Sequence, residues 1–137
     1  MVKAQLAFYK AKHGNFVDKA IAWYTNSEFS HVELILNGWW YSTSPRDLEV
    51  RRKIIRPNPD RWEFVDIGVD KEHVLALYEK TKGSKYDWLG ITLSQFINAN
   101  IHDSQRWFCS EWSATAMKIP NANRYSPEKL YRRVKEI

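Results

Sequence analysis

One cysteine has the residue type and the local setting that nucleophilic catalysis requires. Cys109 is the only cysteine of the chain, and it stands where a polar loop gives way to a predicted helix over 109–117. The unpaired N–H groups and the positive dipole end of a helix N-terminus stabilise a thiolate, and they can also donate to an oxyanion on an attacked carbonyl. We therefore expect Cys109 to act in acyl transfer. The alternative is a cysteine that only packs in the core.

A nucleophilic thiol needs a base, and His31 is the histidine that a strand holds most rigidly. Segments 30–36 and 39–44 have strand patterns and are joined by Asn37-Gly38, which favours a type I′ hairpin turn. That turn pairs Leu36 with Trp39 and Leu34 with Tyr41. One face of the hairpin is then apolar, with Val32, Leu34, Leu36, Trp39, Tyr41 and Thr43. The other face carries His31, Glu33, Ile35, Trp40, Ser42 and Ser44.

This second face offers His31 several partners that would hold its tautomer. Glu33 lies on the same strand, Ser44 lies opposite and Ser42 lies diagonally. The alternative is a partly buried histidine whose hydrogen bonds to these neighbours have only a structural role. Glu33 and Ser42 would then form a solvated cross-strand pair. His102, in the loop before Cys109, is a rival base, and surface positions are expected for His13 and His73.

The elements that position these residues follow from hydrophobic periodicity. Strand patterns cover 3–9, 30–36, 39–44, 49–56 and 62–67, with a loop at 57–60. Helix patterns cover 15–24, a segment capped by Asp70 that stops at Gly83, one from about Asp87, 109–117, and one that Ser126-Pro127 opens. The order predicts an α+β fold in which an antiparallel sheet of about five strands packs with helices, within one domain over 1–137.

Composition excludes several classes of protein. The 137 residues are 44% hydrophobic and 15% aromatic, which is too apolar for a disordered chain, and the apolar runs are too interrupted for a membrane span. One cysteine excludes an intrachain disulfide and a multi-cysteine zinc site, and the histidines show no helical metal-ligand spacing. No glycine-rich phosphate loop follows a strand, which disfavours nucleotide-dependent chemistry. From these observations together we expect no metal and no cofactor. The N-terminal segment is unlike a secretory signal peptide, and we expect a cytoplasmic protein.

Three motifs together resemble a known family. They are Ser30-His31-Val32-Glu33-Leu34, then Gly83-Ser84-Lys85-Tyr86-Asp87-Trp88-Leu89-Gly90, and finally Trp107-Phe108-Cys109-Ser110-Glu111-Trp112. In this order they resemble the circularly permuted papain-like branch of the NlpC/P60 cysteine peptidases and amidases, in which the histidine precedes the cysteine. The chain is similar in particular to small members encoded by tailed bacteriophages, which would place it in the host cytoplasm. The resemblance extends from Leu6 to Met117.

The resemblance implies roles for individual residues. Cys109 would be the nucleophile, His31 the general base, and the third polar residue would lie within Tyr41-Ser42-Thr43-Ser44, where Ser42 and Ser44 already flank His31. Many relatives have glycine where this chain has Glu33, so Glu33 is a further candidate for the third residue. Substrate binding or oxyanion stabilisation would fall to Tyr86, Ser110 and Ser44; alternatively, Tyr86 is an aromatic packed ahead of a helix.

Two classes of function are therefore carried forward. The first is a cysteine hydrolase that cleaves an amide (a peptide, isopeptide or peptidoglycan crosslink) or a thioester through an acyl-enzyme, or an acyltransferase with the same protein chemistry. The second is a non-enzymatic binding protein for nucleic acid or a protein partner, favoured by a net charge of +5. It would use Arg51, Arg52, Lys53 and Arg56 with exposed Trp39 and Trp40. Those charges also fit a solvated edge strand, so we expect no nucleic-acid binding.

Overall fold

The computed structural model describes residues 1–10, 28–43, 49–86 and 106–136, and over these ranges the protein is an α+β structure. Its centre is a five-stranded sheet in the order β4-β3-β2-β1-β5, with every neighbouring pair antiparallel. The strands are β1 (Val2–Lys10), β2 (Phe29–Leu36), β3 (Trp39–Ser42), β4 (Arg51–Lys53) and β5 (Trp62–Val69). The predicted fold class and the sheet of about five strands are confirmed.

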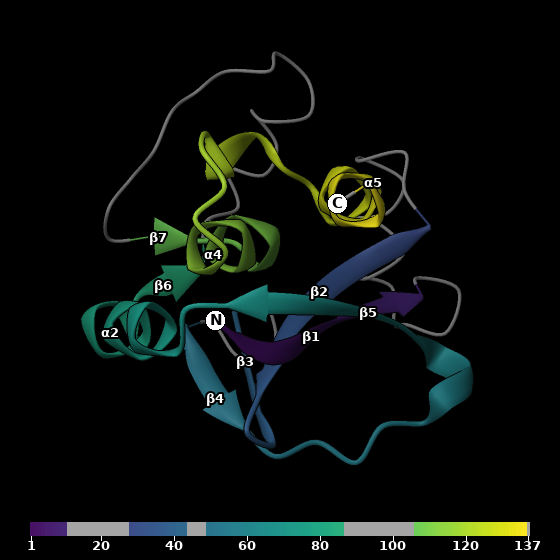
Figure 1. Ribbon diagram of the computed structural model, residues 1–137, viewed down its shortest axis with the longest axis horizontal. Coiled ribbons are helices and arrows are strands. Elements are labelled where there is room, and N and C mark those ends of the chain that lie inside the picture. Colours follow the sequence, from purple (N-terminus) through teal and green to yellow (C-terminus); the bar gives the residue numbers. More distant parts are fainter. Residues whose placement is uncertain (11–27, 44–48, 87–105, 137) are drawn as a thin grey trace.

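Helices cover one face of this sheet (Figure 1). Helices α4 and α5 pack on β2, and α2 lies beside α4. The helices are α2 (Lys71–Thr81), α4 (Cys109–Ala116) and α5 (Pro127–Lys135), with short 3₁₀ turns η2 (Pro59–Arg61) and η3 (Ala122–Arg124). A separate parallel pair joins β6 (Lys85–Tyr86) to β7 (Arg106–Trp107). None of the helices in the described ranges has the length and apolar character needed to cross a bilayer.

The β2–β3 hairpin has the predicted turn and register. Asn37 and Gly38 have φ values of 52° and 82°, the positive angles that a type I′ turn requires. The pairs are Leu34 with Tyr41, Ile35 with Trp40 and Leu36 with Trp39. From Val32 to Leu36, even-numbered residues of β2 therefore face the helices, and odd-numbered residues, including Glu33, face the other side of the sheet. The register shift near the start of β2 places Phe29 on the helix side as well, where its ring packs on Tyr131 of α5.

The core lies between the sheet and the helices and fixes where α4 sits. The fully buried Trp112 of α4 stacks on Tyr41 of β3, with ring centroids 5.8 Å apart and an interplanar angle of 5°. Its indole Nε1 donates to Thr81 Oγ1 at 2.8 Å, so the polar edge of the ring is satisfied as well. These contacts tie α4 to β3 on one side and to α2 on the other, and the first residue of α4 is Cys109.

The helix boundaries follow the predicted caps. The Asp70 carboxylate accepts from the N–H groups of Glu72 and His73, and Ser126 Oγ accepts from Lys129 N–H. The strand expected over 49–56 is shorter, because the ladder of β4 ends at Lys53 and the chain then leaves the sheet toward Pro57. The parallel β6–β7 pair was not predicted. The helices expected over 15–24 and from about Asp87 lie outside the described residues.

The turn glycine gives a test of the hairpin. A Cβ added at Gly38 meets nothing within 4 Å, so Gly38→Ala adds only the strain of a positive φ. We expect this variant to lose about 1–2 kcal/mol of unfolding free energy in urea titrations. Gly68→Ala is the matched control, because its Cβ meets only the Met1 side chain at 3.4 Å and no positive φ is involved. Equal stability of the two variants would contradict the turn assignment.

Candidate active site

His31 lies near the start of β2, at the point where the β2–β3 ladder ends. It pairs with Tyr9 on β1, whereas the pairs of β2 with β3 run from Leu34 to Leu36 and β3 stops at Ser42. Ser42 Oγ donates to the Val32 carbonyl oxygen at 2.6 Å and so satisfies the backbone where the ladder ends. The structure thus directs the Ser42 hydroxyl to the backbone, and Ser44 lies outside the described residues.

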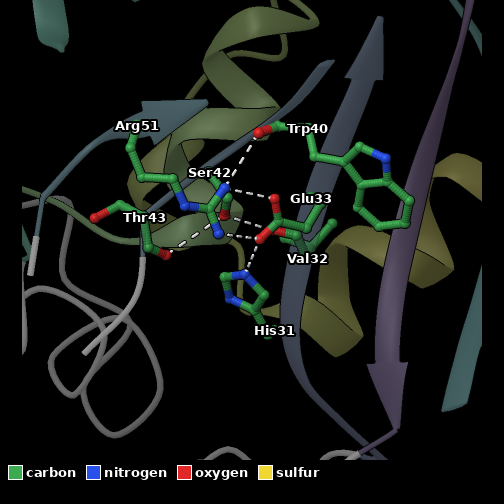
Figure 2. A network of polar contacts seen from close by, with 7 residues as sticks. All are labelled: His31, Val32, Glu33, Trp40, Ser42, Thr43 and Arg51. Atoms are coloured by element: carbon green, nitrogen blue, oxygen red, sulfur yellow. Dashed lines mark hydrogen bonds and ion pairs between the residues drawn. The ribbon is translucent and has the colours of Figure 1, made fainter. Parts of the chain in front are cut away.

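A buried carboxylate holds the His31 ring (Figure 2). His31 is 4% exposed and Glu33 is 1% exposed, and His31 Nε2 hydrogen-bonds Glu33 Oε2. Of the partners that the sequence offered, Glu33 is therefore the one that the described structure brings to the imidazole. Both residues lie on the same strand face, two positions apart, as the predicted alternation requires.

Arg51 of β4 completes this cluster. Its guanidinium binds Glu33 in a bidentate manner, with Nη1 2.7 Å from Oε1 and Nη2 2.7 Å from Oε2. Nη1 also donates to the Trp40 carbonyl oxygen at 3.2 Å. The two cationic groups therefore lie on either side of one carboxylate.

Cys109 is the first residue of α4 and is 1% exposed. The first bond within the helix runs from Trp112 N–H to the Phe108 carbonyl oxygen at 3.0 Å, so the amides of residues 109–111 precede the regular helical bonding. The Glu111 carboxylate accepts from Phe108 N–H at 3.4 Å. The Cys109 thiol is close enough to His31 to contribute to the raised pKa of the imidazole. The structure thus brings Cys109 and His31 together.

The protonation states follow from these contacts. Burial lowers the pKa of His31, but the Glu33 carboxylate and Cys109 outweigh it and raise the pKa from 6.5 to about 9. Burial raises the pKa of Glu33, but His31 and Arg51 outweigh it, so the Glu33 pKa falls below its ordinary value. At neutral pH the pair is therefore an imidazolium and a carboxylate.

The remaining predicted site residues are placed as follows. Ser110 is buried, and its Oγ donates to the Tyr125 carbonyl oxygen at 2.6 Å, a bond that holds α4 to the segment before α5. The backbone of Tyr86 pairs with Trp107, so the Tyr-Asp motif runs beside the residues that lead into Cys109. His73 is half-buried rather than on the surface, because its Nε2 bonds the Thr115 carbonyl oxygen at 3.0 Å. His13 and His102 lie outside the described residues.

The sequence interpretation missed the role of Arg51 and misplaced Trp40. Trp40 is 5% exposed, where an exposed ring was expected, because it packs edge-on against Trp62 and Phe64 at 5.2 and 6.3 Å. The register of β3 with β4 pairs Ser42 with Arg51, which puts the arginine on the face of Glu33. The alternating charges of this strand were the available signal, but they do not by themselves show which cation faces a buried acid.

Within the described ranges, no three His, Cys, Asp or Glu side chains gather into a group that could hold a metal ion.

The His31–Glu33 pair predicts a pH dependence of stability. A histidine whose folded pKa is raised stabilises the fold fully below its unfolded pKa near 6.5 and loses that contribution as pH rises through the folded pKa. We expect the unfolding free energy of Cys109→Ala, which removes the titration of the thiol itself, to fall by at least about 1 kcal/mol above pH 6.5. Urea titrations between pH 6 and 9.5 measure it. The double variant Cys109→Ala/His31→Gln should lack this decrease, and an identical decrease in both would contradict the pairing.

Comparison with known proteins gives no match. No family model matches the sequence, and no curated protein and no solved structure is significantly similar to it. The function is therefore inferred from the contacts among Cys109, His31, Glu33 and Arg51 themselves.

Proposed function

We propose that this chain is a cysteine hydrolase that cleaves an amide or thioester bond, with Cys109 as nucleophile, His31 as general base and Glu33 as orienting residue. One observation carries the proposal: a single imidazole bonds the buried Glu33 carboxylate and also interacts with Cys109, the first residue of α4. A nucleophile, a base and a group that orients the base are the parts of a catalytic triad.

The contacts assign each ring nitrogen a task. Nε2 of His31 is engaged by Glu33, so Nδ1 is the nitrogen left for the thiol. At neutral pH the ring is an imidazolium, so in the resting site Nδ1 already carries the proton that it took from Cys109 Sγ. The thiolate of this ion pair attacks the substrate carbonyl carbon to form a C–S bond. The imidazolium then returns the proton to the leaving amine or thiol as its bond to the carbonyl breaks. Water, deprotonated by the same ring, hydrolyses the thioester and frees Cys109.

The start of α4 supplies what the oxyanion of this reaction needs. The amides of residues 109–111 precede the first helical hydrogen bond, so they are oriented along the axis with the positive end of the helix dipole. The hydroxyl of Ser110 is committed to Tyr125, so backbone N–H groups rather than this side chain are the proposed donors.

The permuted papain-like arrangement of the NlpC/P60 type is part of the proposal. It is supported by the order of the two elements, because the strand that carries His31 precedes the helix that begins at Cys109. It is also supported by the β6–β7 pair, which brings Tyr86 beside the residues before Cys109. The proposed substrates are a peptide, isopeptide or peptidoglycan amide, or a thioester.

The contacts of the basic strand do not favour a nucleic-acid-binding protein. Arg51 is bound to Glu33, and the Arg52 guanidinium lies over the rings of Trp39 and Tyr78, at 4.6 and 5.2 Å from their centroids. Trp40 is buried. These side chains serve contacts within the protein, which leaves the hydrolase as the function that the geometry supports best.

The reactivity of the thiol tests the pair directly. We expect iodoacetamide to alkylate Cys109 about tenfold faster at pH 6.5 in the parent than in His31→Ala, because the imidazolium stabilises the thiolate where a free thiol, with a pKa of about 8.5, is mostly protonated. Since Cys109 is buried, the rate at pH 6.5 is divided by the rate of the same protein at pH 9.5, so that limited access to the thiol cancels within each protein.

The matched control for this alkylation experiment is His73→Ala, which removes a half-buried histidine bonded to Thr115. It should keep the parental pH profile. Superimposable profiles of the parent and His31→Ala would make Cys109 a packing residue.

Acyl transfer itself gives the second test. Incubation with activated esters and acyl thioesters should add one acyl group to Cys109, detected by intact-protein mass spectrometry, and release product with turnover. Cys109→Ala should form no adduct, and His31→Ala should acylate at least about 100-fold more slowly. Product analysis with an added amine separates hydrolysis from transfer to the amine. Acylation that persists in Cys109→Ala would refute the assigned nucleophile.

A further inference from the structure

We infer that Arg51 is a positioning residue of this site: it clamps the Glu33 carboxylate against His31 and influences the Cys109 thiol only through Glu33. The inference rests on the proposed function and extends it from three residues to four. It concerns a side chain on a different strand, which touches neither the thiol nor the imidazole in any described contact.

The contacts of Arg51 and His31 hold the Glu33 carboxylate in one orientation. Each oxygen of Glu33 receives one nitrogen of the Arg51 fork at 2.7 Å, and Oε2 is in addition the partner of His31 Nε2. A bidentate pair of this kind fixes the plane of the carboxylate as well as its position. Without the fork, the carboxylate is free to turn about its terminal torsion, and the ring that it orients is free to turn with it.

Arg51 is itself held in place by the sheet. Its backbone pairs with Ser42 of β3, and Nη1 also donates to the Trp40 carbonyl oxygen at 3.2 Å. The guanidinium thus has fixed partners on β2 and β3, as Figure 2 shows. The clamp therefore follows from strand order, since β4 lies next to β3 and β3 lies next to β2.

Because Glu33 is buried, its carboxylate depends on the positive charge of Arg51. Glu33 is 1% exposed and the Arg51 side chain is 14% exposed, so the carboxylate depends on protein groups rather than water for its charge. The groups that face it are His31 from its own strand and Arg51 from β4, and Cys109 of α4 acts in turn on His31. Loss of Arg51 leaves the imidazole as its one charged partner among these groups, and a proton that moves from the ring to the acid then neutralises both.

A purely structural crosslink between β4 and β2 makes different predictions from a positioning residue. A crosslink changes the unfolding free energy and leaves the chemistry of the folded thiol unchanged. A positioning residue changes the pH profile of the thiol in the folded protein. It does so only while Glu33 is present to transmit the effect.

The experiment is a double-mutant cycle read by Cys109 alkylation between pH 5.5 and 9.5. The variants are Arg51→Met, Arg51→Lys, Glu33→Gln and Arg51→Met/Glu33→Gln. We expect Arg51→Met to slow alkylation at pH 6.5 about tenfold and to shift the profile toward that of His31→Ala. Arg51→Lys keeps the charge without the fork and should fall between the parent and Arg51→Met.

The cycle isolates the path through Glu33. The alkylation rate of Cys109 in the double variant should lie within about twofold of the rate in Glu33→Gln, because the carboxylate that Arg51 binds is absent from both. Arg52→Met is the matched control, since it removes the neighbouring arginine on the opposite face of the sheet, and it should react like the parent. If Arg51→Met does not fold, Arg51→Lys and Arg51→Lys/Glu33→Gln provide the same comparison.

Each outcome decides between the alternatives. Parental alkylation in Arg51→Met, or effects of Arg51 and Glu33 that simply multiply in the double variant, would overturn the positioning role. The failure of the proposed function looks different, because His31→Ala would then also share the parental profile. Altered alkylation in His31→Ala together with parental alkylation in Arg51→Met would leave the hydrolase standing and remove only the clamp.

Discussion

A carboxylate buried between two cations is the interaction on which this site depends. Glu33 is removed from water on β2, and the imidazole of His31 and the guanidinium of Arg51 supply the hydrogen bonds and positive charge that water would otherwise provide. An ionised acid in this position is tolerable only if both partners are in place. The position of the His31 ring follows from this requirement.

The sheet satisfies the requirement through register alone. A two-residue turn at Asn37-Gly38 sets β3 against β2, and the pairing of Ser42 with Arg51 sets β4 against β3. Because side chains alternate along each strand, these two registers place Glu33 and Arg51 on one face. A shift of one residue in either ladder would move Arg51 to the helix side and leave the acid with His31 as its remaining partner of the two. The same sheet carries the core on its other face, where Trp112 stacks on Tyr41 and places the start of α4.

Much of this arrangement was predictable from the sequence, because it depends on local rules. The turn type, the hairpin register, the caps Asp70 and Ser126 and the helix start at Cys109 each follow from a few neighbouring residues. Glu33 as the partner of His31 was one of the alternatives that strand alternation offered. Arg51 was not predictable in the same way, because its contact crosses two ladders and the sequence between β3 and β4 gives no rule for their register. Trp40 was misplaced for a related reason, since the strand that buries it, β5, lies far along the chain.

The energetics of burial favour a catalytic role over a stabilising one for Glu33, His31 and Arg51. A buried ion cluster is a poor source of folding free energy, because apolar side chains of similar volume often stabilise a protein as well or better. Glu33, His31 and Arg51 occupy a sheet face that also packs Trp40 against Trp62, so apolar packing is available at that place. An imidazole that stays protonated beside a thiol is of no use to packing, whereas it is what a nucleophilic thiolate requires. The cost of removing these charges from water thus supports the proposal that the cluster is a reaction centre.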